Sequence, residues 1–340
     1  MPRAVLKRRP LQNWAVIVFV FFSVSLSAAQ SRDSVLSLLF TGDVLLANHF
    51  KDQIKNDYAY AFARADWFKS ADLSIINLES PLTTCDSARE KPFVFKTPPE
   101  YVKVLQDGGV DLANLANNHI YDYGPCGLLE TIRTLKDAGI HYVGAGADFT
   151  EAHRPAIFER KGVKIGFLAY YGVRTHSESH PAGDDDPGTA LRRLKLIHRD
   201  VRTLRPKVDF LVVIFHWGFE KEHYPKPYQI KFAHRVIDYG ADLIVGHHPH
   251  VLQGVELYKG KAIVYSLGNF IFGGRYQPHY QTAVLRVELN TRNPQKWRLK
   301  FLPVQVDYWQ PHLLTTVQGD SVLKHIETYS QIFKQTMPVW

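Results

Sequence analysis

The 340-residue sequence lacks the features that mark several large classes of protein. It has no low-complexity tract and no internal repeat, which argues against a disordered chain and against a repeat array. Its most apolar stretch, residues 14–26, is shorter than the ~20 residues that comfortably span a bilayer. Hydrophobic residues make up 45% and charged residues 22% of the chain, which is typical of a globular protein with a substantial core.

The chain also lacks a concentrated basic region. Its formal net charge is +8, but residues 1–29 contain four of the basic residues and no acidic residue. The remainder carries 37 basic and 33 acidic residues, a net charge of +4. Nucleic-acid-binding proteins usually show a basic face or a recognisable motif, and neither is present here. We therefore expect no nucleic-acid partner.

The first 29 residues have the layout of a secretory signal peptide. A basic start, an apolar centre and small residues at 27–29 follow one another in the order that export signals use. An uncleaved N-terminal anchor is the alternative interpretation. In both cases we expect the body of the protein to be exported, in the periplasm or cell envelope.

Cysteine is scarce, with only Cys85 and Cys126 in the chain. In an oxidising compartment these two residues could form a disulfide. The sequence does not give their separation in space, so two free thiols remain an equal alternative.

After the leader, predicted strands mostly alternate with predicted helices, which indicates an α/β fold with parallel strands covered by helices. One amphipathic segment, residues 58–69, is predicted to be a helix. Residues 155–170 are predicted to form a hairpin, and two more strands are expected at 283–289 and 297–306. No linker is apparent, so we expect one domain over residues 33–310, followed by a C-terminal tail, residues 311–340, without an assignment.

Polar side chains follow five of the predicted strands. In open α/β sheets, functional sites lie at the carboxyl ends of the strands, so these side chains are expected to meet. A mixture of imidazole nitrogens with carboxylate and amide oxygens suits a divalent transition metal. Two ions about 3.5–4 Å apart would hold the attacking and leaving oxygens of a phosphoryl substrate. The residues concerned are Asp43, Glu79, Asn118, His119, His216, His247, His248 and His250.

Each of these residues also has a simpler interpretation. Asp43 follows a glycine and could belong to a turn, while Glu79 could cap or pair on a loop. Asn118 suits a left-handed turn, and His216 could be a core histidine. Three histidines within four residues after a strand are harder to explain by packing. Taken together, the eight residues favour a site.

The segments around these residues resemble the CapA family of poly-γ-glutamate capsule synthesis proteins. The motifs occur in the family's order over about residues 35 to 275. They are residues 40–43 (FTGD), 77–79 (NLE), 114–119 (NLANNH) with Asp122 and Gly124, 216–218 (HWG) with Glu220, 240–250 (GADLIVGHHPH) and 265–270 (YSLGNF).

The CapA family is similar to calcineurin-like metallophosphoesterases, so the resemblance implies a four-layer αββα sandwich. It implies one or two divalent ions, with Mn, Fe or Zn the most plausible. Asp43 would be a ligand of the first metal, and Glu79 stands where that superfamily usually has a bridging aspartate. Asn118 would be a ligand of the second metal and would form the catalytic pair with His119, the candidate general acid. The remaining ligands would be His216, His248 and His250, with His247 as the rival in a register shifted by one and Glu220 and Asn269 as additional candidates.

The chain departs from the superfamily pattern at its first motif. Where the superfamily has Asp-x-His, this chain has Asp43, Val44 and Leu45, so one ligand is absent. A single ion, or a weak second one, is therefore an alternative to a dinuclear centre.

Two functions are compatible with these features. The first is a metal-dependent hydrolase of a phosphoester or of the exported anionic polymer, in which His119 donates a proton to the leaving group. The second is a non-catalytic protein that binds the polymer or assists a membrane synthase and export complex.

Overall fold

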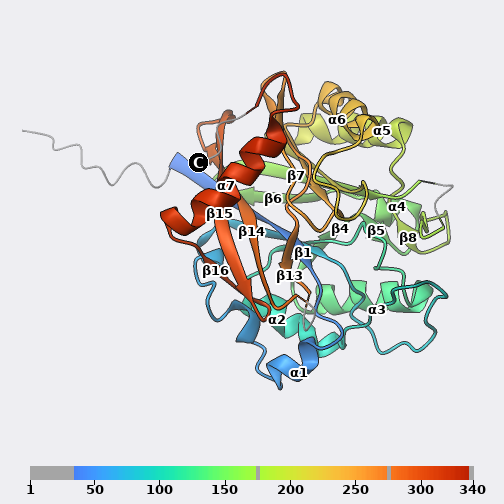
Figure 1. Cartoon of the computed structure of the whole chain (residues 1–340). Coiled ribbons are helices and arrows are strands. Elements are labelled where there is room, and N and C mark those ends of the chain that lie inside the picture. The colour runs from blue at the N-terminus through green and yellow to red at the C-terminus, as the bar shows by residue number, and fades with distance from the viewer. Residues whose placement is uncertain (1–33, 174–176, 274–276, 337–340) are drawn as a thin grey trace, which may run out of the picture.

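The computed structural model describes residues 34–173, 177–273 and 277–336, and its elements are labelled in Figure 1. The predicted leader, residues 1–29, lies outside this part of the chain. The first of two large sheets has eight strands. In spatial order, seven of them are β16 (Gln310–Leu313), β15 (Asn293–Asp307), β14 (His279–Asn290), β1 (Val35–Val44), β2 (Leu73–Leu78), β3 (Leu112–Asn114) and β4 (His141–Val143). The eighth strand, β13 (Asn269–Ile271), pairs with β1 beside this main path.

A six-stranded sheet faces the first. In spatial order it contains β11 (Val255–Tyr258), β12 (Lys261–Val264), β10 (Leu243–His247), β9 (Phe210–His216), β7 (Val163–Tyr171) and β6 (Ala156–Arg160). The central strands of both sheets are parallel: β1 to β4 in the first, and β7, β9, β10 and β12 in the second. The predicted hairpin is the antiparallel pair β6–β7. A small separate ladder joins β5 (Ala145–Gly146) to β8 (Gly188–Thr189).

Alternating side chains divide the core into three layers. Leu38 and Phe40 of β1 belong to the cluster between the sheets, whereas Leu39 faces the opposite way. In β9, Val212 points between the sheets and Val213 points outward. A strand buried on both faces needs such a continuous apolar run.

Helices cover the outer face of each sheet, as Figure 1 shows. The first sheet is covered by α1 (Phe50–Ile54), α2 (Val102–Asp107) and α3 (Gly124–Asp137), and the second by α5 (Leu194–Leu204) and α6 (Pro227–Tyr239), with the short α4 (Phe149–Ala152) beside β5. The order of layers is therefore helix, sheet, sheet, helix, and the predicted αββα sandwich is confirmed.

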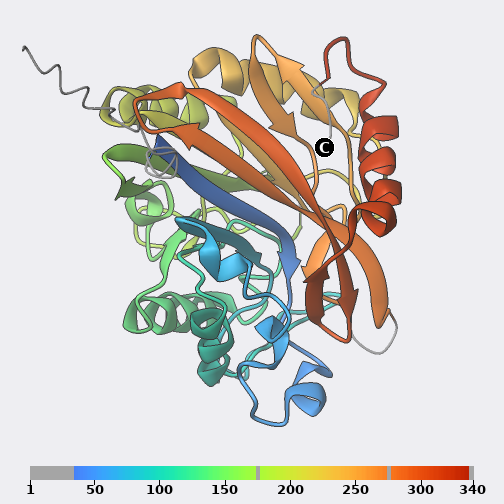
Figure 2. The ribbon, with the colours of Figure 1, turned by 90° about the vertical axis from the view of Figure 1, so that its left-hand side faces the viewer.

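The C-terminal residues that the sequence left without an assignment contain β16 and a long helix, α7 (Thr316–Ser330). Figure 2 shows α7 lying along one side of the molecule, next to the long strands β14 and β15. Val322 and Ile326 of this helix are buried in the cluster between the sheets. The helix therefore closes one end of the core.

The predicted helix over residues 58–69 is wrong. The structure has two short 3-10 turns instead, Tyr60–Phe62 and Phe68–Ser70. The rings of Phe62 and Phe68 both pack against Phe270, at 6.3 and 5.8 Å between centroids. Six residues along an α-helix turn the side-chain direction by about 240°, so one straight helix could not present both rings to the same neighbour.

Within the described ranges, every helix is too short or too polar to cross a membrane.

Candidate metal centre

The polar residues predicted from the strand ends lie together at one end of the sandwich. Asp43 lies in β1, one residue before its end, and Glu79 directly follows β2. His216 is the last residue of β9, and His247 is the last residue of β10. Both sheets therefore contribute to the same site, as parallel strands that end at one edge allow.

One group of ligand atoms surrounds the imidazole of His216. Its Nε2 atom lies 2.7 Å from Asn118 Oδ1, 3.0 Å from His248 Nδ1 and 3.5 Å from Glu79 Oε1. Glu79, His216 and His248 offer ligand atoms that all lie within 4.8 Å of one another. Nitrogen and oxygen atoms of this kind, converging on one point, can hold a divalent cation.

A second group consists of Asp43, Glu79 and His250, whose ligand atoms also lie within 4.8 Å of one another. His250 Nδ1 lies 3.0 Å from Asp43 Oδ2, and His250 Nε2 lies 3.8 Å from Glu79 Oε1. Asn269 approaches the same imidazole, with its Oδ1 atom 2.9 Å from Nδ1. Glu79 thus belongs to both groups and stands between them.

Two of the additional candidates lie at the margin. His247 Nδ1 lies 3.3 Å from Asp43 Oδ1, but this residue belongs to neither group. Glu220 lines the neighbouring cavity and is likewise outside both groups. His248 therefore belongs to the first group and His250 to the second, whereas His247 contacts Asp43 without joining either group.

The burial and the pKa shifts of the two carboxylates are those expected at a cation site. Asp43 and Glu79 are fully buried, and Asp43 Oδ2 and Glu79 Oε1 each lie beside an imidazole, that of His250 at 3.0 Å and that of His216 at 3.5 Å. Burial and the nearby Asp43 carboxylate raise the pKa of Glu79 well above its usual value. Burial also acts to raise the pKa of Asp43, but His247 and His250 outweigh it and hold that pKa well below its usual value. Two buried carboxylates beside imidazole nitrogens fit a divalent ion, which would neutralise both.

Two of the ligand histidines differ in state. Burial acts to lower the pKa of His250, but Glu79 and Asp43 raise it to about 10, so this ring would lose a proton on binding an ion. Burial and the neighbouring His248 lower the pKa of His216 well below its usual value, so the ring is neutral. A histidine must be neutral to bind a metal.

A ladder of buried asparagines positions the carboxylates. Asn77 Nδ2 donates to Asp43 Oδ1 at 2.8 Å, and its Oδ1 accepts from Asn114 Nδ2 at 2.8 Å and from Asn117 Nδ2 at 3.3 Å. Residues behind the ligands fix ligand orientation in metal sites. Sequence reasoning quoted these asparagines only as parts of motifs and gave them no role. Their position inside those motifs was the available signal.

Local backbone geometry brings the ligands to their places. Gly42 belongs to β1 and not to a turn, and a Cβ atom at this position would lie 2.1 Å from the carbonyl oxygen of Gly268. This close approach lets Asp43 N–H donate to the same oxygen at 2.8 Å. His248 and His250 have φ angles of 96° and 57°, which are strained for residues other than glycine. Such strain is typical of functional sites.

His119 lines the same cavity as His216 and His248 of the first group, and other side chains hold it in place. Its Nδ1 atom lies 2.9 Å from Asp122 Oδ2, and Lys91 Nζ lies 2.7 Å from Asp122 Oδ1. Lys91 also donates to the backbone oxygen of Asn118 at 2.9 Å. Burial lowers the pKa of His119, and the hydrogen bond to Asp122 offsets only part of this shift. The sequence gave no role to Lys91 or Asp122, because neither follows a strand.

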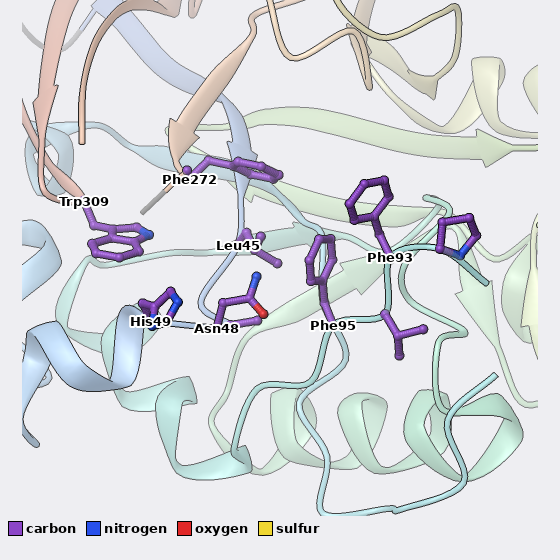
Figure 3. A pocket seen from close by; sticks show the side chains of 11 residues that line it. Leu45, Asn48, His49, Phe93, Phe95, Phe272 and Trp309 are labelled. Carbon is purple, nitrogen blue, oxygen red and sulfur yellow. The ribbon is translucent and has the colours of Figure 1, made fainter. Parts of the chain in front are cut away.

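Two cavities open beside the ligands. One of about 640 Å³ is lined by residues that include Asn118, His119, His216 and His248. The other, of about 630 Å³, is largely aromatic, and Figure 3 shows Phe93, Phe95, Phe272, Trp309 and Leu45 around it. Phe95 packs on His119 at 4.4 Å and Phe272 packs on His250 at 4.7 Å between ring centroids. The aromatic cavity thus borders the site, and Leu45 is one of the residues that line it.

The two cysteines are bonded to each other in the structure, with their Cα atoms 6.2 Å apart. The bond joins the loop after β2 to the first turn of α3. The closed segment contains Lys91, Asn118 and His119.

Comparison with known proteins places the chain in a family. The model of the family described as "Bacterial capsule synthesis protein PGA_cap" matches residues 37–274. The chain belongs to the PGA_cap family. The resemblance predicted from the motifs is therefore confirmed.

Two curated relatives agree with this assignment. The capsule biosynthesis protein CapA of Bacillus anthracis is 31% identical over 316 residues, which cover 88% of this chain and 74% of that protein. The PGA biosynthesis protein CapA of Bacillus subtilis is 29% identical, over 91% of this chain and 80% of that protein. Among solved structures, a novel phosphatase from Mycoplasma pneumoniae aligns with a TM-score of 0.51 and 16% identity, covering 80% of this chain and 94% of that chain. This last likeness concerns the fold alone.

Proposed function

We propose that this PGA_cap protein is an exported, metal-dependent hydrolase that acts in capsule synthesis on a phosphoester or on the polymer itself. The observation that carries the proposal is the position of Glu79, which is shared by two groups of buried ligand atoms. A carboxylate between two cation sites is the arrangement that two-metal hydrolysis requires. The capsule-synthesis names of the family and of its curated relatives support the biological setting.

The residues of the site have two kinds of role, holding the ions and positioning the ligands. Divalent ions held by these side chains would polarise the substrate oxygen and activate a water molecule. Asp43, Glu79 and His250 would hold one ion, and Glu79, Asn118, His216 and His248 the other. Asn77 keeps Asp43 in place by donating to its Oδ1 atom.

His119 is placed to move a proton. Because its Nδ1–H donates to Asp122, its Nε2 atom is the one left to exchange a proton with a group in the cavity. Its lowered pKa favours the neutral ring, in which Nε2 carries no proton, so Nε2 would first take up the proton released by the attacking water. Protonation of the leaving group would then come from Nε2.

Metal analysis and turnover together test the proposal. Protein purified without chelators should contain one or two equivalents of Mn, Fe or Zn and should hydrolyse bis-p-nitrophenyl phosphate or shorten poly-γ-glutamate. His216→Ala and His248→Ala should each lower turnover by about 100-fold or more, since even residues that only orient ligands contribute 10- to 100-fold. His279→Ala is the matched control, because this exposed histidine pairs with Asp307 away from the site. Activity that persists in both ligand variants would contradict the proposal.

Leu45 favours a second candidate function, a non-catalytic subunit that binds the polymer or assists a membrane synthase and export complex. This buried leucine replaces a metal ligand of the superfamily and leaves the group around Asp43 with fewer donors. Capsule formation in a strain that carries only His216→Ala distinguishes the two. Normal capsule would favour the accessory function, and its loss despite normal protein levels would favour the hydrolase.

Export rests on the leader alone. N-terminal sequencing of the protein recovered from the cell envelope tests it. A start near residue 30 would indicate cleavage, whereas a start at Met1 would indicate an anchor.

A further inference from the structure

One arginine lines the cavity beside the metal ligands. Arg192 shares the cavity of about 640 Å³ with His216 and His248. Its backbone N–H donates to Tyr171 O at 3.2 Å, and the Tyr171 ring lies 5.7 Å from the His216 ring. Arg192 therefore lines the same cavity as the ligand group, next to Tyr171.

The guanidinium of Arg192 is oriented by aromatic rings and not by acids. It lies 5.4 Å from the centroid of Tyr228 and 5.5 Å from that of Phe232, both on α6. Among the described residues no carboxylate forms an ion pair with it, and its buried Nε atom has no hydrogen-bond partner. Arg205 shows the contrast, because its guanidinium bonds to Asp242 and to two backbone oxygens.

The acids of the same cavity do not neutralise Arg192. Glu178 lies 3.8 Å from Lys91 Nζ, and among the described residues neither Glu178 nor Glu220 forms an ion pair with Arg192 within 4.0 Å. An arginine presents five N–H donors in a rigid plane, which matches the two oxygens of a carboxylate. Leaving the buried Nε donor without an acceptor costs free energy unless a ligand supplies one.

We propose that Arg192 binds a free carboxylate of the substrate and so selects a polymer of γ-linked glutamate, in which every residue retains one. The inference rests on the proposed function, since it assumes that the ligand group holds the bond to be cleaved. Arg192 then fixes the position of the chain relative to that bond. Stacking on Tyr228 and Phe232 keeps the guanidinium plane in place before the ligand arrives.

Binding measurements test this role without requiring turnover. The probes are a short γ-linked glutamate oligomer and the same oligomer with its α-carboxylates converted to amides, titrated calorimetrically into the mature protein. The unmodified protein should bind the carboxylate form about tenfold or more tightly than the amide form, the factor that one charged hydrogen-bonded pair supplies. Arg192→Gln should abolish this preference and leave amide binding unchanged. Arg192→Lys should retain part of it, because the charge remains and the planar pair of donors is lost.

Arg235→Gln is the matched control. Arg235 is an exposed arginine of α6 that stacks on Tyr239 at 5.9 Å and does not line the cavity, so its loss should not alter the preference. The proposal is overturned if the unmodified protein shows no preference, or if Arg192→Gln keeps it. It is also overturned if Arg192→Gln weakens only the binding of inorganic phosphate, which would make the arginine a phosphate ligand.

The outcomes separate this inference from the proposed function. A preference that depends on Arg192 in a protein that cleaves nothing would leave the inference standing and remove the hydrolase. Turnover that depends on His216, with no preference linked to Arg192, would do the reverse.

Discussion

Replacing both cysteines by serine should destabilise this protein by an amount that the structure allows us to work out. The disulfide between Cys85 and Cys126 spans 41 residues in sequence. In the chain-entropy model, closing a loop of this length raises the free energy of the unfolded state by about 4 kcal/mol at 25 °C, because the unfolded chain loses conformational entropy. For a domain of this size, that corresponds to a fall in melting temperature of about 6 °C.

The closed segment gives little independent stability that could replace the bond. Between residues 83 and 98 it has almost no regular secondary structure. Its contacts include Arg89 N–H to Asp122 O and Phe95 N–H to Asp122 Oδ2, both at 2.8 Å, and the ion pair of Lys91 with Asp122 at 2.7 Å. We therefore expect most of the calculated effect to appear in the measured free energy of unfolding.

Urea unfolding of the oxidised protein and of the double serine variant measures the difference. The reduced unmodified protein is the control, because it separates loss of the bond from loss of the sulfur atoms. A difference below about 1 kcal/mol would refute the loop-closure reasoning. Two free thiols in the denatured, unreduced protein would show that the bond itself does not form.

Three further predictions concern the metal centre. Chelation should lower the stability of the folded protein by about 2.7 kcal/mol when the metal had been present at 100 times its dissociation constant, and unchanged melting in EDTA would argue against a bound ion. His248→Gly should be more stable than His248→Ala by about 1 kcal/mol in chemical denaturation of the metal-free protein, because only glycine relieves a φ angle of 96°; equal stabilities would mean that the backbone is not strained. Asp122→Asn should cost about 3 kcal/mol in thermal unfolding, since it removes the partner that lies 2.7 Å from buried Lys91; a loss within about 0.5 kcal/mol would show that Glu178 suffices for that lysine.

Much of the candidate site could be predicted from the sequence, because a buried strand appears as an apolar run and its end as the polar residue that follows. Buried apolar runs stop at Asp43, Glu79 and His216. Each run predicts a strand, and the place where it stops predicts which end of the strand holds the polar residue. The strand order could not be read in the same way. The pairing of β1 with β13 and β14 joins segments from opposite ends of the chain, and no local pattern specifies it.

The wrong helix at residues 58–69 and the two site residues that were not predicted, Lys91 and Arg192, also have physical explanations. The two turns within residues 58–69 have the composition of a helix, and only the position of Phe270 explains why they are not one. Lys91 lies in a segment without periodicity and Arg192 at the start of a predicted helix, residues 191–204, so no strand-end pattern connects either with the ligands. Tertiary contacts decide both cases.

The central place of β1 in the first sheet has a consequence for the folding route. Val35 lies opposite Asn290, so the strand that begins the folded body gains its antiparallel neighbour only when almost the whole chain is present. Pairings so distant in sequence slow folding, because a large loop must close before any contact rewards it. The sheet around β1 can therefore be completed only after β14 has been synthesised.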